Sequence, residues 1–344
     1  MPVPFADMQV ANLPVTFLAP MQDITDAGFM EIVKNRGAPN FYIAEYFRIH
    51  EFFELDPHVL NSVLWSPDCV SAQFIGEDES FIARAIDELK KYPQIKMLDL
   101  NLGCPAPKVY KKNVGGGLLR DPKKIASIMR VMRSNWDGCF SVKMRTGFDS
   151  DANFADVFKV VLDGSPDFIS LHARTVKQLY KGTPNYDKIA EAVQMSNVPV
   201  IANGDIISAQ RAYDVIRQTG CAGVMVGRHA VRNPWIFRQI ADKLSGREVF
   251  VPRLAEVRKY VDDLLANIQT QNLRFPDSRL KKFLNFVGAS IDPNGDFLFK
   301  MRRARGLDEL LKVCDEFMVD NNNADKPFHQ EPYEGVCSRP NCEL

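Results

Sequence analysis

The sequence predicts a (β/α)8 TIM barrel of the α/β class with a C-terminal helical domain. Eight short apolar runs recur between residues 15 and 227, and most are followed by a Gly, Pro, Asn or Asp turn signal. The runs are continuously apolar rather than alternating, which is typical of strands that helices bury on both faces. The segments between them, such as 78–92 and 121–134, place apolar residues three and four positions apart and so predict helices. An open, doubly wound sheet is the alternative architecture for the same alternation.

The spacing of the runs singles out one loop. We expect strands at 15–19, 41–45, 71–75, 97–101, 140–144, 168–172, 198–202 and 223–227. Successive runs begin 25–30 residues apart, except that 43 residues separate the starts of the fourth and the fifth. The extra residues include NLGCPAPKVYKKNVGGG, which carries Cys104 and three consecutive glycines. An insertion on one rim of a barrel is typical of a functional loop.

The pattern of the chain changes after residue 245. Segments 254–270, 278–290 and 306–319 have amphipathic helical spacing, with no strand-like run between them. We therefore divide the chain into an N-terminal arm at 1–14, a barrel domain at 15–245, a helical domain at 251–320 and an acidic tail at 321–344.

Charge and composition restrict the classes of partner. The 43 Lys and Arg residues balance 43 Asp and Glu residues, which argues against indiscriminate polyanion binding. Residues 274–305, however, carry eight Lys or Arg and three Asp, whereas residues 306–344 carry three Lys or Arg and nine acidic residues. This basic block points to a polyanionic partner. No apolar run is long enough to cross a bilayer and no N-terminal targeting pattern is seen, so we expect a cytoplasmic protein with no membrane partner.

The seven cysteines are scattered, odd in number and without a Cys-x-x-Cys pair. This pattern excludes the usual zinc and iron–sulfur signatures, and we expect no bound metal. The closest pair, Cys337 and Cys342, is interpreted as reduced and incidental.

Polar side chains and glycines gather at the carboxyl ends of seven of the eight predicted strands, and only the first ends on the apolar pair Pro20-Met21. Active sites of barrels lie at this face, so the pattern predicts an active site. The alternative is that the strands merely reach the surface there. In strand order the residues are Glu45, Gln73, Asn101 with Cys104, Lys143 with Arg145, His172 with Arg174, Asn203-Gly204-Asp205, and Gly227-Arg228.

The turns after the seventh and eighth strands contain Gly204 and Gly227. Glycine lets backbone N–H groups approach an anion closely, and Arg228 adds a positive charge. Because barrels often bind phosphate at these turns, we expect a phosphorylated cofactor.

Lys143 lies late in the apolar run SVKMR, where an unpaired lysine is costly to bury. It therefore needs an anionic or carbonyl partner. Two interpretations stay open: a Schiff base, as in a lysine-dependent aldolase, or stabilisation of negative charge on a reduced flavin. His172, in SLHAR, is either a donor to the same ring or a satisfied core histidine, and Arg174 two residues later favours the first.

Seven segments in this order resemble the tRNA-dihydrouridine synthases: LAPM, DLNLGCPAPKV, GGGLL, VKMRTG, LHARTVKQLYKG, PVIANGDI and VMVGRHAVRNPWIF. The resemblance covers residues 15–240 and continues through RLKKFLNF in the helical domain. The segment AEYFRIH resembles the bacterial C-type branch, and the resemblance favours position 16 of the tRNA as the target. It implies an FMN-dependent, monomeric oxidoreductase. This enzyme would reduce the 5,6 double bond of specific uridines in the tRNA D-loop, with NADPH as electron source.

The resemblance also implies roles for individual residues. Cys104 would be the proton donor of the reaction. The flavin would be lined or held by Pro20, Met21, Gln22, Gln73, Lys143, His172, Asn203, Gly204, Asp205, Gly227 and Arg228.

The chemistry of uracil reduction agrees with these roles. The reaction needs a hydride at C6, which a flavin supplies, and a proton at C5, which an acid on the other face must supply. A thiol with the ordinary pKa of about 8.5 is mostly protonated at neutral pH and can donate. A uridine in folded tRNA must leave its stack to be reached. Candidates for its Watson–Crick edge are Asn101, Arg145 and Arg174, and candidates for the tRNA phosphates are Arg48, Arg279, Lys281 and Lys282.

Three other functions fit parts of the sequence. An FMN-dependent barrel that acts on a small pyrimidine, of the dihydroorotate or dihydropyrimidine dehydrogenase type, shares the phosphate turns and the rim lysine. It leaves the basic helical segment unexplained, although SRLKK also fits a solvated helix face. An aldolase would use Lys143 and leave Cys104 without a role. A non-enzymatic RNA-binding protein would be expected to have lost the polar residues at the carboxyl ends of the strands, and this sequence retains them.

Overall fold

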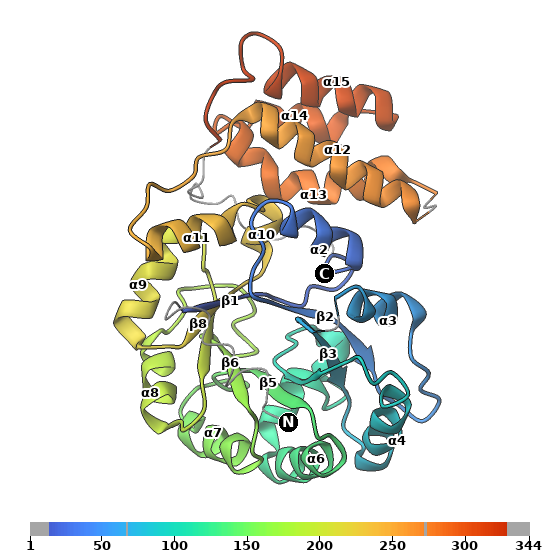
Figure 1. Ribbon diagram of the computed structural model, residues 1–344, viewed down its shortest axis with the longest axis vertical. Coiled ribbons are helices and arrows are strands. Elements are labelled where there is room, and N and C mark those ends of the chain that lie inside the picture. The colour runs from blue at the N-terminus through green and yellow to red at the C-terminus, as the bar shows by residue number, and fades with distance from the viewer. Residues whose placement is uncertain (1–13, 67, 272–273, 329–344) are drawn as a thin grey trace. The chain divides into compact units, whose positions relative to one another are not determined.

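Eight parallel strands form a closed barrel in the computed structural model, which describes residues 14–66, 68–271 and 274–328 (Figure 1). Each strand pairs with the next in the chain, and β8 returns to pair with β1. The predicted TIM barrel is confirmed, and the open sheet is wrong because the two edge strands pair. The strands are β1 Val15–Leu18, β2 Phe41–Arg48, β3 Val70–Ile75, β4 Met97–Leu102, β5 Cys139–Arg145, β6 Phe168–His172, β7 Val200–Asn203 and β8 Gly223–Val226.

A helix follows each strand, as expected for βα units. The connections contain α2 Ala27–Lys34, α3 Pro57–Leu64, α4 Glu79–Leu89, α6 Pro122–Asn135, α7 Phe154–Asp163, α8 Asp187–Met195 and α9 Ala209–Thr219, with α10 Arg228–Arg232 and α11 Ile236–Leu244 after β8. The long connection after β4 holds two further short elements, the helix α5 Pro107–Tyr110 and the 3₁₀-helix η1 Gly115–Arg120. Figure 1 shows α3, α4, α6, α7 and α8 around the strands.

Large apolar side chains fill the barrel near the amino ends of the strands. Phe17 of β1 lies at the centre, with its ring 5.0 Å from that of Phe41 and 5.2 Å from that of Phe168. Met97 and Cys139, each the first residue of its strand, belong to the same buried cluster. Because this layer fills the amino end, the polar residues of the barrel lie toward the carboxyl ends, where the site is built.

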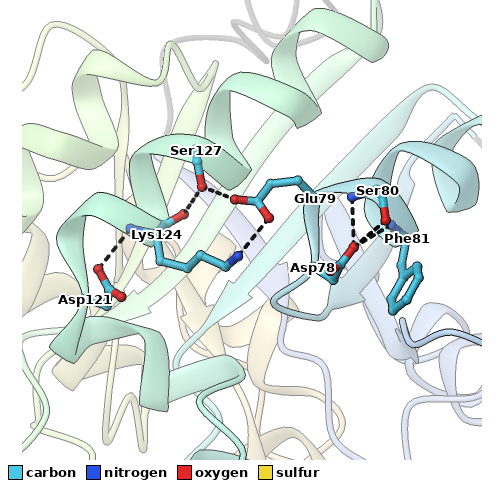
Figure 2. Close-up of polar contacts among 7 residues, drawn as sticks. All are labelled: Asp78, Glu79, Ser80, Phe81, Asp121, Lys124 and Ser127. Carbon is cyan, nitrogen blue, oxygen red and sulfur yellow. Dashed lines mark hydrogen bonds and ion pairs between the residues drawn. The ribbon is translucent and has the colours of Figure 1, made fainter.

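Two capped helices flank the strand that leads to Cys104. The Asp78 carboxylate accepts the backbone N–H groups of Ser80 at 2.9 Å and Phe81 at 3.0 Å at the start of α4, and Asp121 accepts the N–H of Lys124 at 3.0 Å at the start of α6. Glu79 of α4 pairs with the Lys124 ammonium at 2.7 Å and also accepts the Ser127 hydroxyl (Figure 2). The hydrogen bond from Ser80 lowers the pKa of Asp78, and that from Lys124 lowers the pKa of Glu79. These contacts fix α4 and α6 to one another.

The described residues divide into two compact units. The first comprises residues 14–27, 39–206 and 212–227, and the second comprises 28–38, 207–211 and 228–328. The predicted arm and most of the predicted acidic tail, with Cys337 and Cys342, lie outside the described residues. Within the described part of the chain, no helix has both the length and the apolar character needed to cross a membrane.

The second unit contains the predicted C-terminal helices: α12 Leu254–Thr270, α13 Pro276–Ile291, α14 Asp296–Arg303 and α15 Gly306–Met318. The sequence patterns predict three of these and miss α14, which has only eight residues. This helix packs closely on α13, since a Cβ added to Gly288 would lie 2.4 Å from Leu298 Cδ2. The close approach explains why glycine stands in the middle of α13.

Candidate active site

Cys104 lies in the loop that leaves β4, and a side chain from the strand itself holds this loop. Asn101 Oδ1 accepts the backbone N–H of Gly103 at 3.0 Å and that of Cys104 at 2.9 Å. The Arg145 Nε–H of the neighbouring strand β5 donates to the Gly103 carbonyl at 3.0 Å. The backbone of Cys104 is therefore fixed on both sides, and its side chain is half-buried.

Two residues of the triple glycine, Gly115 and Gly116, lie against Cys104. The Gly116 N–H donates to the Cys104 carbonyl at 3.3 Å, and a Cβ added to Gly116 would lie 2.9 Å from that oxygen. Gly115 has a φ of +57°, and its Cβ would lie 3.1 Å from Cys104 Cβ. Both positions need glycine because the two stretches of backbone approach so closely. The glycines thus position the thiol.

Tyr46 of β2 lies beside Cys104 and was not among the sequence candidates. Both residues, with Ala106, pack against the cluster of Ile75, Val109 and Val114. The Tyr46 hydroxyl donates to Gln22 Oε1 at 3.3 Å. Burial raises the pKa of Tyr46 to about 12, so the phenol is neutral. Tyr46 therefore connects the Cys104 loop with the loop after β1.

Lys143 of β5 is half-buried, and no hydrogen bond or ion pair within 4 Å links its ammonium to any part of the chain that the structure describes. Burial lowers its pKa to about 8; Arg145 acts in the same direction, whereas Asp99 and Cys104 oppose the shift. Lys143 pairs with Asn101 in the β4–β5 ladder, and Asn101 holds the Cys104 loop, so the strand register brings together the two parts of the chain on which the sequence argument depends. A half-buried ammonium of this kind is suited to an anionic or carbonyl partner from a ligand.

Below the rim, four buried polar side chains form one continuous chain of hydrogen bonds. Asn101 Nδ2 donates to Gln73 Oε1 at 2.8 Å, and Gln73 Nε2 donates to Asp99 Oδ2 at 2.7 Å. The Ser141 hydroxyl donates to the other carboxylate oxygen at 2.5 Å. Gln73 is predicted to contact the flavin. Its amide oxygen and one N–H of Nε2 already form hydrogen bonds within the protein, so the second N–H of Nε2 is the group available to a ligand.

The loop after β1 is held by Thr25 and Glu45. The Thr25 hydroxyl donates to the Ala19 carbonyl at 3.1 Å and accepts the Met21 N–H at 3.0 Å. The Glu45 carboxylate accepts the backbone N–H groups of Asp23 and Ile24, while burial raises its pKa to about 7. Pro20 and Met21 are half-buried in this loop, and Gln22 is exposed.

Two rim arginines are engaged by loop backbone. Arg145 Nη1 donates to the carbonyls of Thr175 at 2.8 Å and Leu179 at 2.7 Å. Arg174 donates through Nε to the Lys181 carbonyl at 3.1 Å. Both side chains are buried, with 2% of Arg145 and 1% of Arg174 exposed, so they tie the loop after β6 to its neighbours.

The ends of β6 and β7 meet at a tight turn. Gly204 has a φ of +115°, and a Cβ placed there would lie 3.5 Å from His172 Cε1. Asn203 Nδ2 donates to the Met225 carbonyl of β8 at 2.8 Å, and the Asp205 carboxylate binds Arg174. His172 is buried at the end of β6. Gly227 follows β8, and a Cβ added to it would lie 3.6 Å from Ala19 Cβ. Arg228 is the next residue in the chain.

Comparison with known proteins decides the family. Residues 17–300 match the family model described as dihydrouridine synthase (Dus). The chain belongs to the dihydrouridine synthase family. It is therefore an enzyme, an oxidoreductase of a flavin-dependent family.

Curated relatives of this dihydrouridine synthase match it over most of its length. The tRNA-dihydrouridine synthase B of Pseudomonas aeruginosa is 33% identical over 317 residues, 89% of this chain and 93% of the relative. The protein of the same name from Xanthomonas axonopodis pv. citri is 30% identical over 319 residues, 88% of this chain and 92% of the relative. The tRNA-dihydrouridine(16) synthase of Neisseria meningitidis serogroup A is 27% identical, over 89% of this chain and 95% of that protein. The two relatives with the higher identities carry the B name and so favour a B-type member over the C-type branch expected from AEYFRIH.

A solved structure shares the fold at much lower identity. The 2-naphthoyl-CoA reductase structure has a TM-score of 0.50 and 9% identity, covering 67% of this chain and 50% of that chain. The likeness supports the barrel architecture alone.

The predicted phosphate contacts of this dihydrouridine synthase lie on two elements. Arg48 is exposed at the end of β2, and α13 of the second unit carries the other three. Lys282 is exposed, the Arg279 guanidinium lies 5.9 Å from the Phe283 ring, and the Lys281 ammonium donates to the Ala304 carbonyl at 2.6 Å. Lys281 therefore holds the end of α14 within the unit.

Sequence reasoning missed Tyr46, Asp99 and Ser141 as parts of this site. Asp99 stands inside the fourth predicted strand, MLDLN at 97–101, and a charged residue within a continuously apolar strand is the signal that would have found it. Ser141 carries no such signal, because its importance depends on its pairing with Asp99 across the β4–β5 ladder.

Proposed function

We propose that this dihydrouridine synthase uses FMN and NADPH to reduce the 5,6 double bond of a uridine in the tRNA D-loop, with Cys104 as the proton donor. The observation that carries the proposal is the placement of Cys104 at the carboxyl end of the barrel. Its backbone is fixed by Asn101, and Lys143 pairs with Asn101 in the β4–β5 ladder. The curated relatives named tRNA-dihydrouridine synthases support tRNA as the substrate.

The residues present fit a flavin. The Lys143 ammonium has no hydrogen-bond or ion-pair partner among the described residues, and Gly204, with a φ of +115°, lets the backbone turn tightly after β7. Lys143 would face the ring, with Pro20, Met21, Gln22, Gln73 and His172 around it; Asn203, Gly204, Asp205, Gly227 and Arg228 would hold the ribityl phosphate. When bound, the reduced flavin supplies the hydride for C6 of the uracil.

The protein's own residues supply the proton and the geometry. Cys104 donates its thiol proton to C5, and the loop contacts of Asn101 and Gly116 keep the sulfur in place. A protonated Lys143 stabilises negative charge on its ligand. We assign Arg145 and Arg174 to positioning the loops around the everted base, because carbonyls and Asp205 already engage their guanidinium groups.

The basic residues outside the barrel interior would bind the tRNA backbone. Arg48, Arg279 and Lys282 are the proposed phosphate contacts, and Lys281 supports them through its bond to Ala304. A tRNA substrate would place the enzyme in the cytoplasm, and we propose that it acts as a monomer.

Substrate competition tests this function against reduction of a small pyrimidine. Purified enzyme with NADPH is given unmodified tRNA, free uracil or orotate, and products are measured by mass spectrometry. We expect dihydrouridine in tRNA only, and binding of tRNA that weakens steeply as salt is raised. Conversion of a free pyrimidine with no product in tRNA would overturn the proposal.

A further inference from the structure

We propose that Asp99 is a positioning residue that fixes the Cys104 loop through Gln73 and Asn101 and balances the charge of Lys143. This role rests on the functions proposed above for Cys104 and Lys143. Asp99 and Gln73 are fully buried, Ser141 is 1% exposed and Asn101 is 7% exposed, so water does not compete for these bonds.

The direction of each hydrogen bond follows from the one before it. Asn101 Oδ1 already accepts two backbone N–H groups, so its Nδ2 must face Gln73 and donate. The Gln73 oxygen is thereby used as an acceptor, and its Nε2 needs an acceptor in turn. Asp99 Oδ2 provides that acceptor at 2.7 Å. The orientation of the amides is therefore set from the Cys104 loop down to the carboxylate.

The last group of this hydrogen-bond chain must accept two hydrogen bonds, and a carboxylate can do so. Ser141 Oγ donates to Oδ1 and Gln73 Nε2 to Oδ2. An ionised carboxylate only accepts, whereas a hydroxyl or an amide would present a hydrogen to one of these donors. Burial raises the pKa of Asp99 to about 6, opposed by hydrogen bonds from Ser141 and Gln73 and by the charge of Lys143, so Asp99 is ionised at neutral pH.

Asp99 is also the carboxylate that acts on Lys143. In the β4–β5 ladder, Asp99 pairs with Ser141, and Lys143 is two residues further along the same face of β5. Asp99 of β4 and Cys104 of its loop raise the pKa of Lys143, and Arg145 of β5 lowers it. The neighbouring strand β6 pairs the uncharged Ser170 with Lys143, and His172 follows two residues later.

Two substitutions separate the two parts of the role. Asp99→Asn removes the charge, so the titration midpoint of Lys143 should fall by about one pH unit, and the introduced amide N–H group meets one of the two donors, so the rate of Cys104 alkylation should also change. Gln73→Met cuts the hydrogen-bond chain without a change of charge. It should change the rate of Cys104 alkylation several-fold and leave the Lys143 midpoint in place. Ser71→Ala is the matched control, because among the described residues this buried hydroxyl bonds to the carbonyl of the adjacent Ala72 alone.

Both readouts use the purified full-length enzyme and need no substrate. Competitive reductive methylation across pH, read by peptide mass spectrometry, gives the Lys143 midpoint, and iodoacetamide labelling gives the Cys104 rate. If Asp99→Asn does not fold, Ser141→Ala replaces it, and a smaller fall of the Lys143 midpoint is expected. Folded variants with wild-type midpoints and wild-type Cys104 rates would overturn the role of Asp99. Because neither readout involves tRNA, that result is distinct from a failure of the proposed function.

Discussion

The Arg174 guanidinium and the Asp205 carboxylate form a two-point ion pair, with Nη1–Oδ1 at 3.0 Å and Nη2–Oδ2 at 2.6 Å. Arg174 is buried after β6, and Asp205 stands in the turn after β7 with a φ of +44°. Arg174 also donates to the Gly182 carbonyl at 2.5 Å. One guanidinium thus joins a rim loop to the turn expected to hold the cofactor.

Asp205→Asn should lower the free energy of unfolding by about 2–3 kcal/mol, because it leaves the buried Arg174 charge without its counterion. Urea unfolding measures this loss. The exposed pair of Lys159 and Asp163 offers a matched control, and Asp163→Asn should cost about 0.5 kcal/mol or less. Equal losses in the two variants would contradict the structural role given to the Arg174–Asp205 pair.

The pH dependence of flavin reduction should report Lys143. Its pKa is lowered to about 8, so the ammonium is present below that pH and lost above it. The rate of anaerobic flavin reduction by NADPH, followed by stopped-flow absorbance, should therefore fall as pH rises through about 8. In Lys143→Arg the side chain stays charged, and the fall should disappear from this range. An unchanged profile in that variant would show that another group titrates.

Glu45 should make the protein less stable as pH rises from about 4.5 to about 7. Its pKa is raised to about 7 in the folded state, so the folded protein binds more protons than the unfolded chain across this window. The free energy of unfolding is therefore highest at pH values below 4.5, the ordinary pKa of Glu, and falls as Glu45 ionises in the folded protein. Glu45→Gln should remove this part of the pH dependence in urea unfolding at pH 5 and pH 8. The exposed Glu77→Gln should behave like wild type, and a wild-type slope in Glu45→Gln would refute the prediction.

Gly116→Ala should impair turnover more than stability. The added Cβ would lie 2.9 Å from the Cys104 carbonyl oxygen and 2.5 Å from Val176 Cγ2, so the Cys104 loop must move. We expect a cost of about 1–3 kcal/mol in unfolding free energy and a larger fractional loss of dihydrouridine formation. Gly246→Ala is the comparison: it has a φ of +68° but no atom within 4 Å, and should cost about 1 kcal/mol with turnover retained. Equal turnover in both variants would count against the supporting role of Gly116.

The eight strands could be predicted because each is a short apolar run buried on both faces, and that pattern is visible in the sequence alone. The rim residues could be predicted for the same reason, since they follow the runs directly. The partners of those residues could not, because they depend on register between strands. Asn101 and Arg145 looked like contacts for a base, but the folded chain brings backbone groups of the Cys104 loop to both.

Helix α14 and the close approach of Gly116 illustrate the same limit. Helix α14 is only eight residues long, too short for its apolar spacing to mark a helix by itself, and its place becomes clear only against α13. The triple glycine marked a functional loop in the sequence, but only the folded chain shows that Gly115 and Gly116 lie against Cys104. Tyr46 likewise gains its position from the cluster around Val109, which joins segments far apart in the chain.

The central claim, that Cys104 donates the proton, is tested most directly by single turnover. Enzyme reduced by NADPH without oxygen is mixed with unmodified tRNA, and dihydrouridine is measured over time by mass spectrometry. Cys104→Ala should keep its flavin and its tRNA affinity and form dihydrouridine about 100-fold or more slowly, whereas Cys69→Ala should match wild type. Formation at the wild-type rate in Cys104→Ala would contradict the account.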